Sequence, residues 1–259
     1  MIHVSPISAF NDNYIWLISC STTNTAWVVD PGDASPVNQY LNQHQLTLAG
    51  VLITHHHYDH IGGLKELLKQ HNPVSYGPAK ENIPGIQHAL KAGDTLNVLG
   101  AELEVLEVAG HTRGHIAYFS DQLLDQPTLF CGDTLFAGGC GRLFEGTPKQ
   151  MYLSLSQIAS LPQNTLVYCA HEYTSANLHF ANAVEPNNSV LQQRIHQVKE
   201  KRAQSQPTVP SLLSDELATN PFLRCSHTSV QTAASQQAGK PLSNPVDVFA
   251  AIRHWKDHF

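Results

Sequence analysis

The sequence predicts an α/β layered fold followed by a smaller helical part. Up to about residue 174, short runs rich in β-branched and aromatic residues are separated by Gly, Asp and Pro, a pattern typical of strands and turns. Helical stretches lie between several of these runs, so helices are expected to cover sheets. After about residue 175 the strand pattern fades. We therefore expect a main domain over residues 1–174 and an α-helical subdomain over residues 175–259.

Seven runs in the first part are expected to be strands. Several are nearly continuous apolar stretches, as in strands that are buried on both faces. They are Tyr14–Ser19, Ala26–Asp30, Gly50–Thr54, Leu103–Val108, Ile116–Ser120, Thr128–Cys131 and Thr165–Cys169. Between them, Ser35-Pro36 begins a helix with a cap residue and a first-turn proline. Leu64–His71 and Pro148–Leu161 are also expected to be helical.

The second part is expected to consist of helices and loops. Ala176–Val184 and Ser189–Gln204 have helical patterns, and a connection with Pro and Ser follows over residues 208–224. Residues 229–244 (SVQTAASQQAGKPLSN) are expected to form a mobile loop. The last helix should begin at Asn244-Pro245, again a cap followed by a proline. Its apolar residues recur every three or four positions and form one face: Val246, Phe249, Ile252, Trp255 and Phe259.

Composition and charge exclude several classes of protein. Hydrophobic residues make up 42% of the 259 residues, so a sizeable core is available. The net charge of −6 argues against a nucleic-acid partner, which needs a basic face. The sequence has no apolar run of about 18 residues and no secretory leader pattern, and its scattered cysteines indicate free thiols. We therefore expect a cytoplasmic monomer without a membrane partner.

The stretch LITHHHYDHIGG carries the strongest functional signal. After the apolar run GVLIT the chain presents His55-x-His57-x-Asp59-His60. In an extended segment alternate side chains share a side, so His55 and His57 can face one metal while His56 points away. Asp59 and His60 lie further along and can reach a second metal. By composition, such a motif arises by chance on the order of a few times in a thousand chains, which makes a merely solvated histidine cluster the weaker interpretation.

Three further metal-ligand candidates follow expected strands. His111 follows LEVLEVAG, Asp133 follows TLFCG, and His171 follows TLVYCA. Each alone could be structural, but side chains at the ends of successive strands converge on one edge of a sheet. His115 competes with His111 for the same role. We prefer His111 because it directly follows Ala109-Gly110 at the strand exit, and because this choice agrees with the family pattern described next.

Seven short stretches together resemble the glyoxalase II (hydroxyacylglutathione hydrolase) family of the metallo-β-lactamase superfamily. They are NDNY, VDPGD, THHHYDHIGG, GHTRGH, FCGDTLFAGGCGRLFEGT, HEYT and NPFLR, and they span nearly the whole chain. The resemblance implies a four-layer αββα sandwich with a dinuclear metal site, and a C-terminal helical region that the superfamily in general lacks. It implies that His55, His57 and His111 hold one metal, that Asp59, His60 and His171 hold the other, and that Asp133 bridges them.

A dinuclear site of this kind suits thioester hydrolysis. Two divalent cations about 3.5–4 Å apart share a water and supply hydroxide at neutral pH, and one of them polarises the attacked carbonyl. Asp59 and Asp133 remove part of the metal charge, which keeps the hydroxide nucleophilic. The leaving thiol has a pKa near about 8.5, so it needs little help from an acid. We expect Zn(II), with Fe or Mn as alternatives.

The family resemblance implies that S-2-hydroxyacylglutathione is hydrolysed to a 2-hydroxy acid (D-lactate) and glutathione, the second step of methylglyoxal detoxification. It assigns glutathione-binding roles to Arg142, Tyr173, Arg253 and Lys256. Arg253 and Lys256 form an i, i+3 pair expected to face away from the apolar stripe of the last helix. A solvated helix face is the alternative for this pair. At Phe144 the family often has Tyr, so a hydroxyl contact would be lost there.

Other functions of the same superfamily compete with the hydrolase. A mononuclear iron persulfide dioxygenase acting on glutathione persulfide would leave Asp59, His60 and His171 idle. A nuclease is disfavoured by the acidic balance, and a β-lactam or lactone hydrolase by the basic pair of the last helix. In VDPGD, Asp30 or Asp33 is expected to support a ligand or to form a turn.

Overall fold

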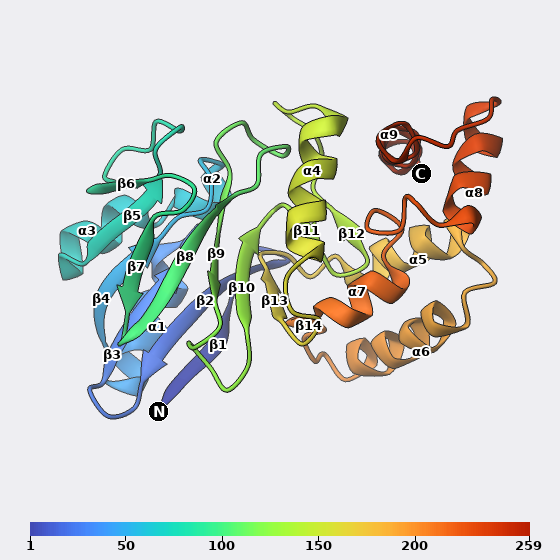
Figure 1. Ribbon diagram of the computed structural model, residues 1–259. Helices are drawn as coiled ribbons and strands as arrows, with labels where there is room; N and C mark the ends of the chain where they lie inside the picture. The colour runs from blue at the N-terminus through green and yellow to red at the C-terminus, as the bar shows by residue number, and fades with distance from the viewer. The chain divides into compact units, whose positions relative to one another are not determined.

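A computed structural model describes residues 1–259, which form two compact units (Figure 1). Unit 1 comprises Met1–Glu107 and Thr112–Gly132. Unit 2 comprises Val108–His111 and Asp133–Phe259. The chain therefore enters unit 2 briefly at residues 108–111 before it returns to unit 1.

The first sheet of unit 1 has six strands in the order β1-β2-β3-β4-β5-β6. They are β1 (Ile2–Ala9), β2 (Asn13–Cys20), β3 (Thr25–Val29), β4 (Thr47–Leu52), β5 (Val74–Pro78) and β6 (His88–Leu90). The first three pair antiparallel, and β3 to β6 pair parallel. Parallel strands need helical crossovers, and helices α1 (Ala34–His44) and α3 (Leu64–His71) supply two of them. The short helix α2 (Tyr58–Ile61) precedes α3.

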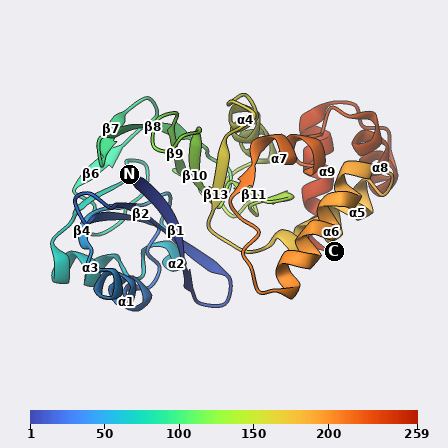
Figure 2. The same cartoon turned by 90° about the horizontal axis from the view of Figure 1, so that it is seen from below.

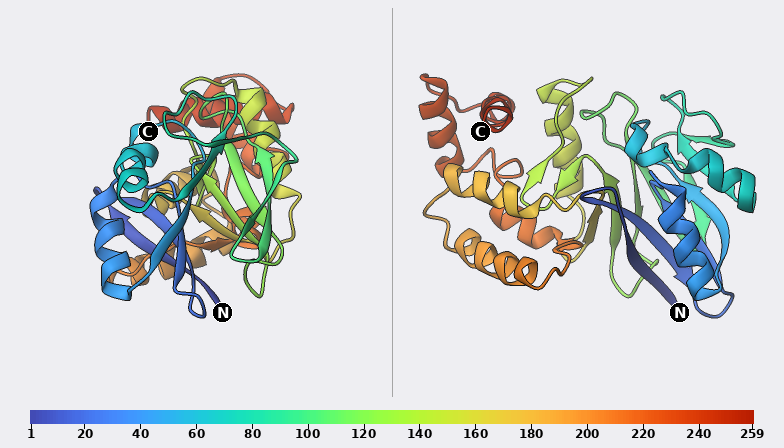
Figure 3. Two further views of the ribbon diagram at one scale, coloured as in Figure 1. Left: turned by 90° about the vertical axis from the view of Figure 1, so that its left-hand side faces the viewer. Right: turned by 180° about the vertical axis from the view of Figure 1, so that it is seen from behind.

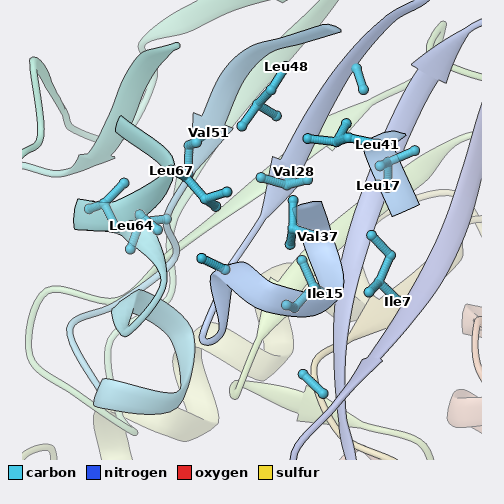
Figure 4. Close-up of a cluster of buried hydrophobic side chains, with 14 of the residues drawn as sticks. Ile7, Ile15, Leu17, Val28, Val37, Leu41, Leu48, Val51, Leu64 and Leu67 are labelled. Carbon is cyan, nitrogen blue, oxygen red and sulfur yellow. The ribbon is translucent and has the colours of Figure 1, made fainter. Parts of the chain in front are cut away.

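The core of unit 1 lies between this sheet and its two covering helices (Figure 4). Strand β2 contributes Ile15 and Leu17, while α1 contributes Val37 and Leu41. Helix α1 begins at Ala34, because the carboxylate of Asp33 caps it by accepting from the Ser35 amide at 2.8 Å. The expected cap at Ser35 was therefore wrong by two positions.

The second sheet of unit 1 is antiparallel and faces the first sheet (Figure 3, left). Its strands are β7 (Thr95–Val98), β8 (Ala101–Glu107), β9 (Ile116–Ser120) and β10 (Thr128–Gly132). The buried hydroxyl of Tyr118 on β9 donates to the carbonyl of Ile53, the residue that follows β4, at 2.7 Å. This bond joins the two sheets beside the histidine motif.

Unit 2 is mainly helical (Figure 2). Its strands form two short antiparallel pairs, β11 (Leu135–Phe136) with β12 (Gly139–Cys140), and β13 (Leu166–Cys169) with β14 (Ser211–Leu212). Its helices are α4 (Pro148–Ala159), α5 (Thr174–Val184), α6 (Ser189–Ala203), α7 (Leu213–Thr219), α8 (Thr228–Ala238) and α9 (Pro245–Asp257). Helix α5 packs on α6 and α8, and α9 packs on α4 and α8. The seven expected strands and the expected helices are all present, although their ends shift by up to three residues.

Two expectations for the C-terminal part were wrong. Residues 229–244 are not a mobile loop, because most of them belong to helix α8, which buries Val230 and Ala234 and ends at Gly239 in the left-handed conformation. The connection over residues 208–224 contains β14 and α7. Helix α8 could not be recognised from apolar periodicity, because only two of its side chains, Val230 and Ala234, are buried.

Helix α9 begins at the expected cap and proline, but its buried face differs from the expected one. The buried side chains are Val248, Phe249, Ile252 and Arg253, while Phe259 is 55% exposed. Arg253 therefore lies on the core face, where it stacks over Phe222 with the guanidinium carbon 5.0 Å from the ring centre. A charged residue is tolerated there because both terminal nitrogens of its guanidinium donate hydrogen bonds, to the Cys140 carbonyl and to the Asp257 carboxylate.

The five cysteines are free thiols, and all except Cys20 are buried. No helix of the chain has the length and apolar character that a membrane span requires.

Candidate active site

Four of the expected ligands follow β4 in unit 1: His55, His57, Asp59 and His60. The loop can approach residues 31–34 closely because two glycines lack side chains. A Cβ on Gly32 would lie 1.9 Å from the carbonyl oxygen of Asp59, and one on Gly63 would lie 2.5 Å from the Ala34 amide nitrogen. The IGG and PGD stretches therefore fix the path of the histidine loop.

The carboxylate of Asp30 holds this loop through contacts with Thr54 and His60. It accepts from the Thr54 amide and from the Thr54 hydroxyl, both at 2.7 Å, and Nδ1 of His60 lies 3.0 Å from its Oδ2 atom. A carboxylate at Nδ1 turns the other imidazole nitrogen toward a metal, as in many histidine sites. Of the two aspartates in VDPGD, Asp30 thus supports a candidate ligand and Asp33 caps a helix.

The donors of unit 1 lie close to one another. Nε2 of His55 is 3.1 Å from Nδ1 of His57, and the rings of His55 and His60 are 4.0 Å apart. One ligand atom from each of Asp30, His55 and His60 falls within 4.8 Å of the others, and all three residues are buried. Oδ2 of Asp59 is 3.4 Å from Nε2 of His60 and accepts from Asn13 at 2.9 Å.

His56 points to a different partner from its two neighbours. Its Nδ1 lies 2.9 Å from Oε2 of Glu81, whose side chain is buried. The other oxygen of Glu81 accepts from the Thr112 hydroxyl and from the Gly114 amide. Glu81 thus ties the histidine loop to the GHTRGH loop, a role that no sequence motif signalled.

His115 also belongs to unit 1, and it stacks flat on the ring of His55 with 4.5 Å between ring centres. It is fully buried, and its Nδ1 lies 3.1 Å from the Ile116 carbonyl oxygen. His111, its competitor, lies in unit 2. His115 therefore packs behind a candidate ligand.

Unit 2 holds the other three candidate ligands around one carboxylate. Nε2 of His111 lies 3.4 Å from Oδ2 of Asp133, and Nε2 of His171 lies 3.4 Å from Oδ1. The other ring nitrogen of His111 is 2.9 Å from the Arg142 carbonyl oxygen. A carbonyl at Nδ1 requires the proton there, so Nε2 presents its lone pair on the side of Asp133.

A cavity of about 410 Å³ opens beside this group in unit 2. Its lining includes two candidate ligands and all four of the expected substrate-binding side chains. The lining residues are His111, Asp133, Phe136, Cys140, Arg142, Phe144, Tyr173, Ala176, Asn177, Arg253 and Lys256. A larger hollow of about 790 Å³ lies elsewhere in unit 2, but its charged residues, Glu185 and Arg224, neutralise each other at 2.7 Å. The smaller cavity is therefore the better candidate.

The expectation that Arg253 and Lys256 face away from the apolar stripe of α9 was wrong for Arg253, and the alternative of a solvated helix face was wrong as well. Arg253 is 3% exposed, and it donates to the Cys140 carbonyl and to the Asp257 carboxylate, each at 2.9 Å. Lys256 is half-buried, donates to the Asn177 amide oxygen, and lies 5.3 Å from the Phe180 ring centre. Burial, reinforced by the neighbouring charge of Arg253, lowers the pKa of Lys256 to about 8.

The rim of the cavity is more exposed. The Arg142 side chain is 66% exposed and lies 3.9 Å from Asp257. Tyr173 stacks on His171 with ring centres 4.6 Å apart. Phe144 sets its ring edge-on to His111 at 5.3 Å. Asn177 was missed by the sequence reasoning, because an isolated polar residue on an otherwise ordinary helix carries no spacing signal.

Comparison with known proteins shows to which family the chain belongs. A model of the metallo-beta-lactamase superfamily matches residues 10–171, and one described as hydroxyacylglutathione hydrolase C-terminus matches residues 172–259. The hydroxyacylglutathione hydrolase of Nitrosomonas eutropha is 51% identical over 261 residues, with 100% of both chains covered. The corresponding protein of Alkalilimnicola ehrlichii is 54% identical, with 99% of each chain covered.

The chain belongs to the hydroxyacylglutathione hydrolase family of the metallo-β-lactamase superfamily. Solved structures agree on the fold. ETHE1 from Myxococcus xanthus has a TM-score of 0.66 at 23% identity and covers 99% of both chains. A metallo-beta-lactamase from Staphylococcus aureus also has a TM-score of 0.66, at 22% identity over 99% of this chain and 71% of that one. The expected metallo-β-lactamase fold with a helical C-terminal region is thereby confirmed.

Membership of this superfamily also bears on the metal. The histidine and aspartate donors that each unit presents are compatible with a dinuclear metal site. Neutral imidazoles and carboxylates of this kind bind Zn, Fe or Mn, and the donor set does not select among them.

Proposed function

We propose that this protein acts on S-2-hydroxyacylglutathione, with S-lactoylglutathione as its main substrate. Water cleaves the thioester, and the products are a 2-hydroxy acid (D-lactate) and glutathione, as in the second step of methylglyoxal detoxification. The observation that supports this most is the 410 Å³ cavity of unit 2, where two candidate metal ligands meet three cationic side chains. The relatives that share half of the sequence over its full length carry the hydrolase name.

We further propose that two divalent ions, Zn(II) or else Fe or Mn, are the cofactors. The first would be held by His55, His57 and His111, and the second by Asp59, His60 and His171, with Asp133 between them. The carboxylate of Asp133 fits this role, because each of its oxygens faces a different imidazole at 3.4 Å. When bound, such ions polarise a thioester carbonyl and lower the pKa of water.

The protein's own side chains would hold the glutathione part of the substrate. Arg253 and Lys256 form the deeper cationic wall of the cavity, and Arg142 lies at its exposed rim. Glutathione has two carboxylates, which cations bind with charge-assisted hydrogen bonds. Phe136 and Phe144 offer apolar surface, and the Tyr173 hydroxyl offers a donor at the same wall. We propose that residues 175–259 form the glutathione-binding subdomain.

The decisive experiment follows the loss of thioester absorbance of S-lactoylglutathione with metal-loaded and with chelated protein. Turnover that requires metal supports the proposal, and no turnover with either preparation would refute it. Lys256→Met should raise KM far more than it lowers kcat, because it removes a ground-state contact. Lys240→Met, on the loop after α8, is the matched control and should change neither constant.

A persulfide dioxygenase remains the rival function within the superfamily. It is less well supported, because the structural likeness to ETHE1 at 23% identity bears on the fold alone. Oxygen consumption with glutathione persulfide would reveal it. We also propose that the protein is a cytoplasmic monomer, which its free thiols and acidic balance favour.

A further inference from the structure

The short hairpin of β11 and β12 forms one wall of the substrate cavity. Phe136 and Cys140 line the cavity directly, and the candidate ligand Asp133 stands two residues before the hairpin. With two residues in each strand, the hairpin has too few ladder hydrogen bonds to hold its own position. Its geometry must therefore depend on what packs behind it.

Two fully buried side chains hold the hairpin backbone from behind. Oε2 of Glu216 on α7 accepts from the Gly138 amide at 2.8 Å. Nδ2 of Asn220, just after α7, donates to the carbonyls of Phe136 at 3.2 Å and Gly139 at 2.9 Å. The same Asn220 nitrogen lies 3.1 Å from Oε2 of Glu216. One amide and one carboxylate thus satisfy both strands and the turn.

The charge of Glu216 is neutralised deeper in unit 2. Arg194 of α6 pairs with Oε1 of Glu216 and donates to the Thr219 hydroxyl at 2.6 Å. Arg194 is 9% exposed and Glu216 is not exposed at all. Replacing a buried ion pair by apolar residues is often neutral or stabilising. A network of this kind is better explained by the geometry that it enforces than by stability.

The hairpin is hydrogen-bonded to Arg253 of α9 directly and to Lys256 of α9 through Asn177. The Cys140 carbonyl accepts from Arg253 at 2.9 Å. Asn177 donates from Nδ2 to the Ala137 carbonyl at 3.1 Å, while its Oδ1 accepts from Lys256. A shift of the hairpin would therefore move both Arg253 and the partner of Lys256.

We propose that Glu216 and Asn220 are positioning residues for the glutathione subsite, acting through the β11–β12 hairpin on Arg253 and Lys256. This inference rests on the proposed hydrolase function. Neither residue lines the cavity, so both act on the substrate indirectly, and the side chains that they reach through the hairpin are the proposed glutathione-binding cations.

The test compares Asn220→Ala with Thr219→Val. Both remove buried hydrogen bonds of one network, but Thr219 has no bond to the hairpin. For Asn220→Ala we expect KM for S-lactoylglutathione and the calorimetric Kd for glutathione to rise by about tenfold, with kcat changed by less than about threefold. Bound metal should be unchanged. Thr219→Val should lower Tm similarly and leave both constants within about twofold of the wild type.

Hydrogen exchange at the Gly138 amide reports the hairpin directly and should accelerate in Asn220→Ala but not in Thr219→Val. Equal changes of Kd in both variants, or an unchanged Kd in Asn220→Ala, would overturn the inference. If Asn220→Ala does not fold, Glu216→Gln replaces it, with the same pattern expected at about threefold. The proposed function is refuted separately, if the wild type does not hydrolyse S-lactoylglutathione. The Kd values of the variants and the wild type for glutathione are measured without turnover, so they test the positioning role by itself.

Discussion

The ammonium group of Lys256 lies in the cavity of unit 2, where burial and the charge of Arg253 lower its pKa to about 8. The group is therefore mostly protonated at neutral pH and loses its charge as the pH rises through about 8. A carboxylate of the substrate binds the protonated form. Because the unfolded chain holds this proton more tightly, burial of Lys256 also lowers the stability of the folded protein at neutral pH, and this penalty shrinks as pH rises above about 8.

KM should consequently rise with pH. Between pH 7 and pH 9 we expect an increase of up to about tenfold for S-lactoylglutathione, since the protonated fraction of Lys256 falls by that factor. Initial rates across this range measure it. Lys256→Arg should flatten the profile, because a guanidinium stays charged, and Lys256→Met should give a high KM at every pH. A wild-type KM that does not change with pH would contradict the role of Lys256.

A second prediction at the residue scale concerns which of the three consecutive histidines bind metal. His56 lies against Glu81, whereas His55 and His57 lie with ring nitrogens 3.1 Å apart. His57→Gln should therefore lose bound metal, and His56→Gln should retain it while the free energy of unfolding falls by roughly 1 kcal/mol. Metal per chain is measured by plasma mass spectrometry. Loss of metal in both variants would place His56 among the ligands.

Short-range spacing made the histidine motif predictable, because its donors come from neighbouring positions on one loop. The burial of Arg253 could not be predicted in this way. Its partners, Cys140 and Asp257, include a carbonyl 113 positions away in the sequence. The same holds for Asp30, whose contact with His60 depends on the pairing of β3 and β4. Residue types that bind metals are legible in a sequence, but the groups that orient them are set by tertiary structure.

At the scale of whole elements, strands and capped helices were recognised and helix α8 was not. Periodic apolar residues and a proline identify α9, while α8 is mostly Ala, Ser, Thr and Gln. Helix α8 is stabilised by packing of Val230 and Ala234 and by its C-terminal glycine. Gly239 has φ +66° there, and nothing lies within 4 Å of where its Cβ would be.

Gly239→Ala therefore isolates the backbone preference. We expect the free energy of unfolding to fall by about 1 kcal/mol, because Ala adopts the left-handed conformation poorly. Gly239→Asn should lose less, since Asn tolerates that conformation. Tm should fall by about 2–4 °C in the alanine variant, which differential scanning calorimetry measures. Equal losses for both variants would mean that α8 does not end at Gly239 as described.

At the scale of the whole molecule, the family models divide the chain between residues 171 and 172. Packing within unit 2 crosses this line repeatedly. Strand β13 pairs with β14, Asn220 binds the Phe136 carbonyl, and Arg253 binds the Cys140 carbonyl. The helical subdomain therefore shares its buried polar groups and its short sheet with the residues before it.

This sharing predicts how fragments of the chain will behave, and it tests the expected boundary between residues 174 and 175. A fragment of residues 175–259 keeps α5 to α9 but loses β13, α4 and the β11–β12 hairpin. Glu216 and Asn220 would remain in a buried site, but their three hairpin partners, the Gly138 amide and the Phe136 and Gly139 carbonyls, would all be gone. Each group left unsatisfied costs about 1–3 kcal/mol. We expect circular dichroism to show partial helicity without a cooperative thermal transition.

A fragment of residues 133–259 should recover more of the cooperative transition, because it restores the hairpin partners of Glu216 and Asn220. Cooperative unfolding of residues 175–259 alone would instead show that the subdomain is an independent folding unit.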